Sequence, residues 1–170
     1  ADAKTWLRLA ASEDDAIVSS LIAAARKTVE AMTRRMLATQ IWRVALDAWP
    51  ASGVVRLPFA PLQSIAAVRV YDSGNVAQLI APTQYRSFDA ADQPRLELCG
   101  PVPSPARAFA GIEIDGAYGC GAADAAPEPL RQAMLTLIGF WYEHRGADEA
   151  PAMPAAVSAL VAPYIRRRLA

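Results

Sequence analysis

The chain has 170 residues, of which 54% are hydrophobic and 20% are charged, so it can bury the core of one compact domain. Seventeen basic residues balance seventeen acidic ones, which argues against a dedicated nucleic-acid-binding domain, because such domains are usually basic. No apolar run approaches the ~20 residues that a membrane-spanning helix requires.

Two cysteines, Cys99 and Cys120, lie far apart in the sequence and form no CxxC motif. We interpret them as reduced thiols in a protein made in a bacterial cytoplasm, although a disulfide between them stays open.

The first predicted element is a helix over residues 12–37. Ser12 is the expected N-cap, with Asp15 three positions later as its capping-box partner. Apolar side chains then recur every three or four positions, which predicts one buried helix face. The stripe consists of Ile17, Val18, Leu21, Ile22, Ala25, Val29, Met32 and Met36.

The pattern changes to alternation after this helix. Residues 40–47 alternate apolar and other side chains, which predicts a strand. The run Asp-Ser-Gly-Asn at 72–75 predicts a hairpin turn. Three prolines in residues 100–106 predict a loop. Further short strands are expected at residues 54–57, 65–71, 76–80, 85–88, 95–99 and 111–115.

Helical periodicity returns near the C-terminus. A helix is expected over residues 125–145, with prolines in its first turn and Gly146 as its C-cap. A last apolar segment spans residues 157–165, where Pro163 should kink or interrupt the helix.

The order of elements predicts an α+β protein. We expect a small helical bundle, made of a long N-terminal helix and two C-terminal helices, with an inserted antiparallel β block. The expected segments are the helix at 1–38, the β-rich insertion at 39–120, and the C-terminal helices with a tail at 121–170, all in one compact unit.

Catalytic and metal-binding patterns are weak in this sequence. The single histidine, His144, is better explained by its place at a helix C-terminus than as a general base. One histidine and two separated cysteines do not make a zinc site. The glycine-rich run at 116–121 lacks the Gly-Lys-Ser/Thr ending of a phosphate loop, so we interpret it as a flexible link from strand to helix. We therefore predict no catalytic, cofactor-binding or metal-binding residue and no cofactor.

The basic tail at 164–169 allows three interpretations. It could be a solvated helix end or a weak contact to DNA phosphates. It could also be a docking peptide, in which apolar side chains anchor and arginines pair with carboxylates. Its residues are Tyr164, Ile165, Arg166, Arg167, Arg168 and Leu169.

Five stretches in this order resemble one known family, the head-tail connector (adaptor) proteins of long-tailed bacteriophages and gene transfer agents. The resemblance covers nearly the whole chain. The stretches are DDAIVSSLIAAARKTVEAMTRRML with the following QIWRVALDAWP, LPFAPLQSIAAVRVYDSGN, IDGAYGCGAADAAPEPLRQAMLTLIGFWYEHRG, and VSALVAPYIRRRL.

The resemblance implies a structural, non-enzymatic protein of the virion neck, assembled in the host cytoplasm. It implies a dodecameric ring beneath the portal protein that extends the DNA channel, with a stopper or tail-terminator protein on its other face. Genomic DNA would be only the channel contents, and no membrane is involved. The portal-docking residues carried over are Tyr164, Ile165, Arg166, Arg167, Arg168 and Leu169.

Two alternatives remain. The chain could be another neck or tail-completion protein that binds tail components or DNA without the portal. It could also be a small enzyme that uses His144 or Cys120, which would require a pocket with polar groups beside one of them.

Overall fold

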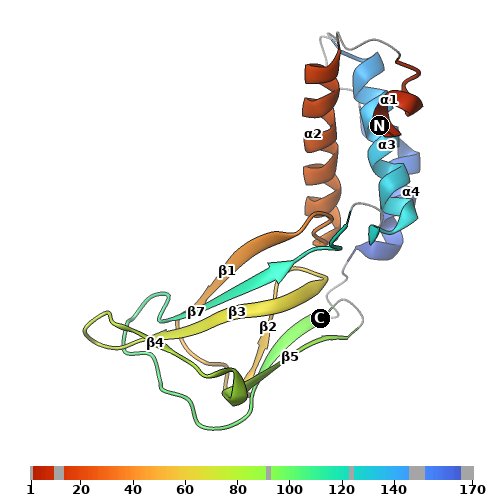
Figure 1. The fold of residues 1–170 in the computed structure, drawn as a ribbon. Coiled ribbons are helices and arrows are strands. Elements are labelled where there is room, and N and C mark those ends of the chain that lie inside the picture. Colours follow the sequence, from red (N-terminus) through yellow and green to blue (C-terminus); the bar gives the residue numbers. More distant parts are fainter. Residues whose placement is uncertain (1, 10–13, 91–92, 123–124, 146–151, 166–170) are drawn as a thin grey trace. The chain divides into compact units, whose positions relative to one another are not determined.

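A computed structural model describes residues 2–9, 14–90, 93–122, 125–145 and 152–165. Its contacts divide the chain into two compact units. The helical unit comprises residues 1–35 and 124–170, and the strand unit comprises residues 36–123. The expected α+β class is confirmed, because the α-helices all belong to the first unit and the antiparallel strands to the second (Figure 1).

The helical unit is built around α3, which contacts α1, α2 and α4. Small and branched side chains at its buried positions allow this close packing. Among the described residues, no helix is both long enough and apolar enough to span a bilayer. The elements are α1 (Asp2–Trp6), α2 (Asp15–Thr33), α3 (Glu128–Glu143), α4 (Ala155–Val161) and the 3-10 turn η3 (Ala162–Tyr164). The buried apolar residues are Ala3, Val18, Ala25, Val29, Leu130, Ala133, Leu137, Ile138, Val157 and Val161.

The long helix α2 ends four residues earlier than the sequence predicts. It stops at Thr33, because Arg34 takes a left-handed conformation with φ of 56° and donates its N–H to the Glu30 carbonyl at 2.8 Å. Met36, which fits the helical stripe by spacing, is instead buried in the core of the strand unit. The predicted cap Ser12 lies outside the described residues. The expected helical segment at 1–38 contains two helices, because a separate short helix, α1, precedes α2.

The strand unit contains two antiparallel sheets, one of order β1-β7-β3-β4 and one of order β2-β6-β5. A predicted strand lies at each of these positions. The strands are β1 (Gln40–Leu46), β2 (Val54–Arg56), β3 (Leu62–Tyr71), β4 (Ala77–Leu79), β5 (Tyr85–Ala90), β6 (Gln93–Leu98) and β7 (Ile112–Tyr118), with the 3-10 turn η1 (Pro82–Gln84) before β5.

The interpretation of residues 116–121 as a flexible link is wrong in part, because β7 continues through Gly116 to Tyr118. Glycine is needed at 116, where a Cβ would lie 2.8 Å from the Tyr118 ring. The buried Tyr118 ring contacts Phe59 edge-on, and burial raises the pKa of its hydroxyl to about 12.

One hydrophobic cluster joins the two sheets. Every second residue of β7 faces it, so Glu113 and Asp115 lie on the opposite face of the four-stranded sheet. The cluster therefore holds the strands together and fixes which side chains reach the outer face. Its buried members are Met36, Val55, Leu57, Val68, Val70, Ile80, Leu96, Ile112, Ile114 and Tyr118.

The backbone directly after β7 passes close to Ala38, and Gly119 allows this close approach to be tested. Gly119 has φ of 140°, and a Cβ there would lie 2.5 Å from the Ala38 carbonyl oxygen. We expect Gly119→Ala to lower the free energy of unfolding in urea by at least about 1 kcal/mol. Gly100→Ala is the matched control, because a Cβ at Gly100 meets nothing within 4 Å. Equal stability of the two variants would contradict this path.

Candidate functional site

The structure describes the first two residues of the predicted docking tail. Tyr164 lies in the turn η3, and the Arg35 guanidinium lies 5.6 Å from its ring centroid. Ile165 is extended and 41% exposed. Pro163 interrupts the helix as predicted, because α4 ends at Val161 and a 3-10 turn follows it. Arg166, Arg167, Arg168 and Leu169 lie outside the described residues.

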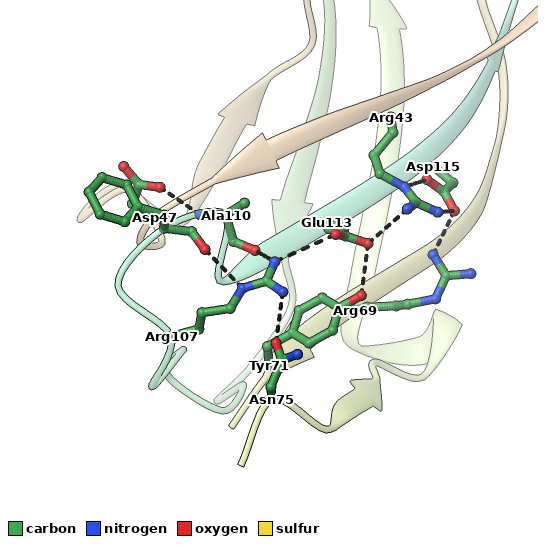
Figure 2. A network of polar contacts seen from close by, with 10 residues as sticks. Arg43, Asp47, Arg69, Tyr71, Asn75, Arg107, Ala110, Glu113 and Asp115 are labelled. Carbon is green, nitrogen blue, oxygen red and sulfur yellow. Dashed lines mark hydrogen bonds and ion pairs between the residues drawn. The ribbon is translucent and has the colours of Figure 1, made fainter. Parts of the chain in front are cut away.

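A second candidate region lies on the outer face of the four-stranded sheet (Figure 2). Two arginines bind the Asp115 carboxylate from the flanking strands. Arg43 on β1 donates from Nε at 2.7 Å and from Nη2 at 3.0 Å, and Arg69 on β3 donates at 2.5 Å. Arg43 also lies 3.2 Å from Glu113. The two carboxylates of β7 thus tie β1 and β3 to the central strand.

These contacts stabilise the ionised form of Asp115. The hydrogen bond from Arg43 lowers the pKa of Asp115 from 3.8 to about 2, and the bond from Arg69 acts in the same direction, while burial opposes both. The same hydrogen bond raises the pKa of Arg43 above its ordinary value. The outer face therefore carries a fixed set of ion pairs.

Arg107 anchors the long loop between β6 and β7 through several contacts. Its Nε donates to the Phe109 carbonyl at 2.8 Å, and its Nη1 donates to the Asn75 side chain at 2.9 Å. Its guanidinium lies 3.9 Å from the Tyr71 ring centroid and 3.5 Å from Glu113. One cation thus connects the loop to the β3–β4 turn and to β7, as Figure 2 shows.

Further bonds hold the same loop. The Ala110 N–H donates to Asp47 at 2.8 Å, and the Trp49 indole donates to the Pro103 carbonyl at 3.0 Å. A Cβ at Gly111 would lie 2.5 Å from Pro105, so the loop passes too close for another residue there. The loop nevertheless leaves the Phe109 side chain 79% exposed. An exposed aromatic side chain on a loop that hydrogen bonds hold in place is typical of a protein–protein contact surface.

The residues that sequence analysis weighed for chemistry are dispersed. His144 is exposed, with Nδ1 2.7 Å from the Phe140 carbonyl oxygen and its ring against the Phe140 ring. Cys99 and Cys120 do not form a disulfide, and Cys99 is exposed. In the parts of the chain that the structure describes, no three His, Cys, Asp or Glu side chains are grouped as a metal site. A described hollow, lined by Asp2, Thr5, Trp6 and Arg8, contains neither His144 nor Cys120.

Sequence analysis missed the arginine–carboxylate network. The pairs around Asp115 join residues 46 and 72 positions apart, so no local sequence pattern predicts them. The one usable signal was the strand expected at 111–115, because side chains two positions apart in a strand lie on the same face. Which arginines meet them depends on strand order and register.

The comparisons with known proteins agree with the resemblance. The family model for phage gp6-like head-tail connector proteins matches residues 1–82. A chain in the neck of an empty gene transfer agent (GTA) particle, computed with C6 symmetry, is 30% identical with a TM-score of 0.86, and the match covers 99% of this chain and 89% of that chain. The chain belongs to the phage gp6-like head-tail connector family.

Two more solved structures resemble this connector. A chain of the native GTA virion is 32% identical with a TM-score of 0.81, over 92% of the connector and 80% of that chain. A chain of the native GTA neck computed with C12 symmetry is 32% identical with a TM-score of 0.79, over 91% of the connector and 85% of that chain. A search of curated protein sequences gives no match.

The network around Asp115 should contribute measurably to the stability of the connector. Asp115→Asn weakens charge-assisted bonds to Arg43 and Arg69, so we expect the free energy of unfolding to fall by roughly 1.5–3 kcal/mol. Glu97→Gln is the control, because Glu97 forms an exposed pair with Arg86 at 3.5 Å and should cost less than about 1 kcal/mol.

The same contribution should depend on pH. The pKa of Asp115 is depressed in the folded state, so its stabilisation is full above the ordinary value of 3.8 and is lost as pH falls through about 2. In urea unfolding, the difference in free energy of unfolding between the wild type and Asp115→Asn should therefore shrink as the pH falls from 3.8 to about 2. A difference that stays constant from neutral pH to about pH 2 would contradict the lowered pKa of Asp115.

Proposed function

We propose that this connector is a structural adaptor of the particle neck, in which copies form a ring between the portal and the next neck or tail protein and lengthen the DNA channel. The single observation that carries this is a likeness to a GTA neck chain over 99% of the connector, in both units. The relatives come from necks computed with C6 and C12 symmetry, which supports a dodecamer. The role requires no catalysis.

Within this proposal, residues 39–120 act as an insertion between the helical segments 1–38 and 121–170. The helices would form the small bundle that carries the C-terminal tail. A net charge of zero fits a channel wall past which DNA must slide, because strong phosphate binding would hold the DNA.

We further propose that residues 164–169 dock onto the portal. The last helical element ends at Tyr164, and Ile165 already has extended backbone with φ of −73° and ψ of 119°. Ile165 thus leaves the helical unit in an extended conformation of the kind that a partner groove can bind. Tyr164, Ile165 and Leu169 would anchor, and the three arginines would pair with carboxylates.

Removing residues 164–170 tests the docking. We expect the truncated chain to remain folded by circular dichroism but to lose co-migration with the portal protein in size-exclusion chromatography, because its anchors are gone. Substituting Arg166, Arg167 and Arg168 by alanine should mainly weaken binding at moderate salt. The matched pair Tyr164→Ala with Ile165→Ala should weaken it at all salt concentrations.

Full portal binding by the truncated chain would contradict the assignment of residues 164–169 to portal docking, but it would not contradict the proposed ring. Binding of the full chain to tail proteins but not to the portal would favour a tail-completion role instead.

A further inference from the structure

In the part of the chain that the structure describes, β1 and β4 are the edge strands of the four-stranded sheet. Strand β1 pairs with β7 on one side and β4 pairs with β3, and neither pairs with another strand within the described residues. An unpaired edge presents backbone donors and acceptors that can pair with another chain. Soluble proteins usually block such edges with lysine, proline or a covering segment. The sequences of β1 (QIWRVAL) and β4 (AQL) contain neither lysine nor proline, and the one charged side chain of these two strands, Arg43, is paired with Glu113 and Asp115 within the sheet.

Each open edge also displays an exposed aliphatic side chain. Ile41 on β1 is 75% exposed and Leu79 on β4 is 69% exposed. Both belong to the outer face, because Ile41 pairs with Ala117 and Leu79 pairs with Arg69, away from the inward set of Ile112, Ile114 and Tyr118. The two edges therefore carry matching apolar surface on the same face of the sheet.

Strand direction makes the two edges complementary. The order β1-β7-β3-β4 is antiparallel at each step, so β1 and β4 run in opposite directions. Neighbours in a twelvefold ring differ by one twelfth of a turn, which changes strand directions little. The β4 of one copy would therefore meet β1 of the next in antiparallel sense, and the alternation would continue unbroken.

The three-stranded sheet lacks this property. With an odd number of antiparallel strands, its edges β2 and β5 run in the same direction, so neighbouring copies would meet in parallel. Its edge strand β5 also contacts β3, where the Asp89 carboxylate accepts a hydrogen bond from the Leu62 N–H at 2.6 Å. The four-stranded sheet is thus the better suited of the two for contacts between copies.

We propose that neighbouring copies join edge to edge, β4 of one against β1 of the next, and so build one continuous antiparallel sheet around the ring. A ring contact requires two different surfaces on each subunit, and the two edges supply them. We assign Leu79 to lie beside Ile41 of the neighbour, which covers both aliphatics. This joint rests on the ring assembly proposed above.

The joint is short, because β4 has three residues. A few backbone hydrogen bonds, each worth about 0.5–1.5 kcal/mol, would not hold separate subunits together in dilute solution. The edges should therefore pair only once the portal has gathered the copies.

Disulfide trapping tests the joint. Leu79→Cys and Ile41→Cys are combined in one chain with Cys99→Ser, which removes the exposed native thiol. The chain is assembled on the portal protein, oxidised with copper phenanthroline, and separated on a non-reducing gel. We expect a ladder of covalent multimers up to the full ring, because facing Cβ atoms of paired strands lie within disulfide reach.

A negative control and a second cysteine pair accompany the disulfide trapping. Leu79→Cys with Phe88→Cys should give no ladder, because Phe88 is 46% exposed but belongs to the three-stranded sheet. Leu79→Cys with Ala45→Cys detects a joint without the four-residue shift along the strand that the Ile41 pair requires, because Ala45, Glu113, Arg69 and Leu79 lie in one row across the sheet and Ala45 shares the face of Ile41. A ladder from either β1 position supports the edge joint.

Charge on the edge gives an independent readout. We expect Ile41→Lys to lower the yield of rings on the portal by roughly tenfold or more, because a lysine ammonium would be buried in the joint. Phe88→Lys, equally polar but outside the joint, should leave the yield near wild type.

Rings that form at wild-type yield with Ile41→Lys and give no ladder from either cysteine pair would overturn the joint while leaving the proposed function intact. Dimers alone from Ile41→Cys would also overturn it, because they indicate twofold pairing of β1. Failure of the unmodified chain to assemble on the portal would instead overturn the proposed function, and the joint with it.

Discussion

The strand unit depends on the two-sided pairing of β7. This strand is hydrogen-bonded to β1 on one side and β3 on the other, and it alternates strictly between buried and outward side chains. Its inward set, Ile112, Ile114 and Tyr118, lies in the hydrophobic core. Its outward carboxylates bind arginines of both neighbouring strands. A slip of one residue would bury those charges and expose the core, so β7 fixes the register of the sheet.

This central strand also explains which surfaces remain for partners. Because β7 and β3 occupy the middle, β1 and β4 are left as edges with opposite direction. In the middle of the outer face, Arg43 and Arg69 both bind Asp115, so their charges are paired within the sheet. Apolar side chains remain at the edges and on the loop that Arg107 fastens. Assembly by edge contact would use the two strands that lie at the edges of the described sheet.

Local patterns predicted most of the secondary structure. Alternation found the strands because side chains of a strand point to two faces in turn, and the three-four stripe found α2 and α3. The same rule misplaced Met36, whose spacing fits a helix although the chain has already left it at Arg34. Gly116 and Gly119 looked like a flexible link, but the space beside Tyr118 and Ala38 requires them.

Long-range pairings could not be predicted in this way. Whether Arg43 meets Asp115, or Arg107 meets Tyr71, depends on strand order, and strand order follows from the whole core. The tail was suggested by its composition, and only Tyr164 and Ile165 have a described conformation. Its assignment to the portal derives from family resemblance, because three arginines beside apolar residues suit several acidic partners.

Native mass spectrometry of the purified chain, alone and with its portal protein, tests the central claim most directly. The adaptor function predicts a monomer alone and a defined assembly with the portal whose mass corresponds to twelve copies of the chain. Absence of any assembly at both low and moderate salt would contradict it, and would direct the search for a partner to other proteins of the particle.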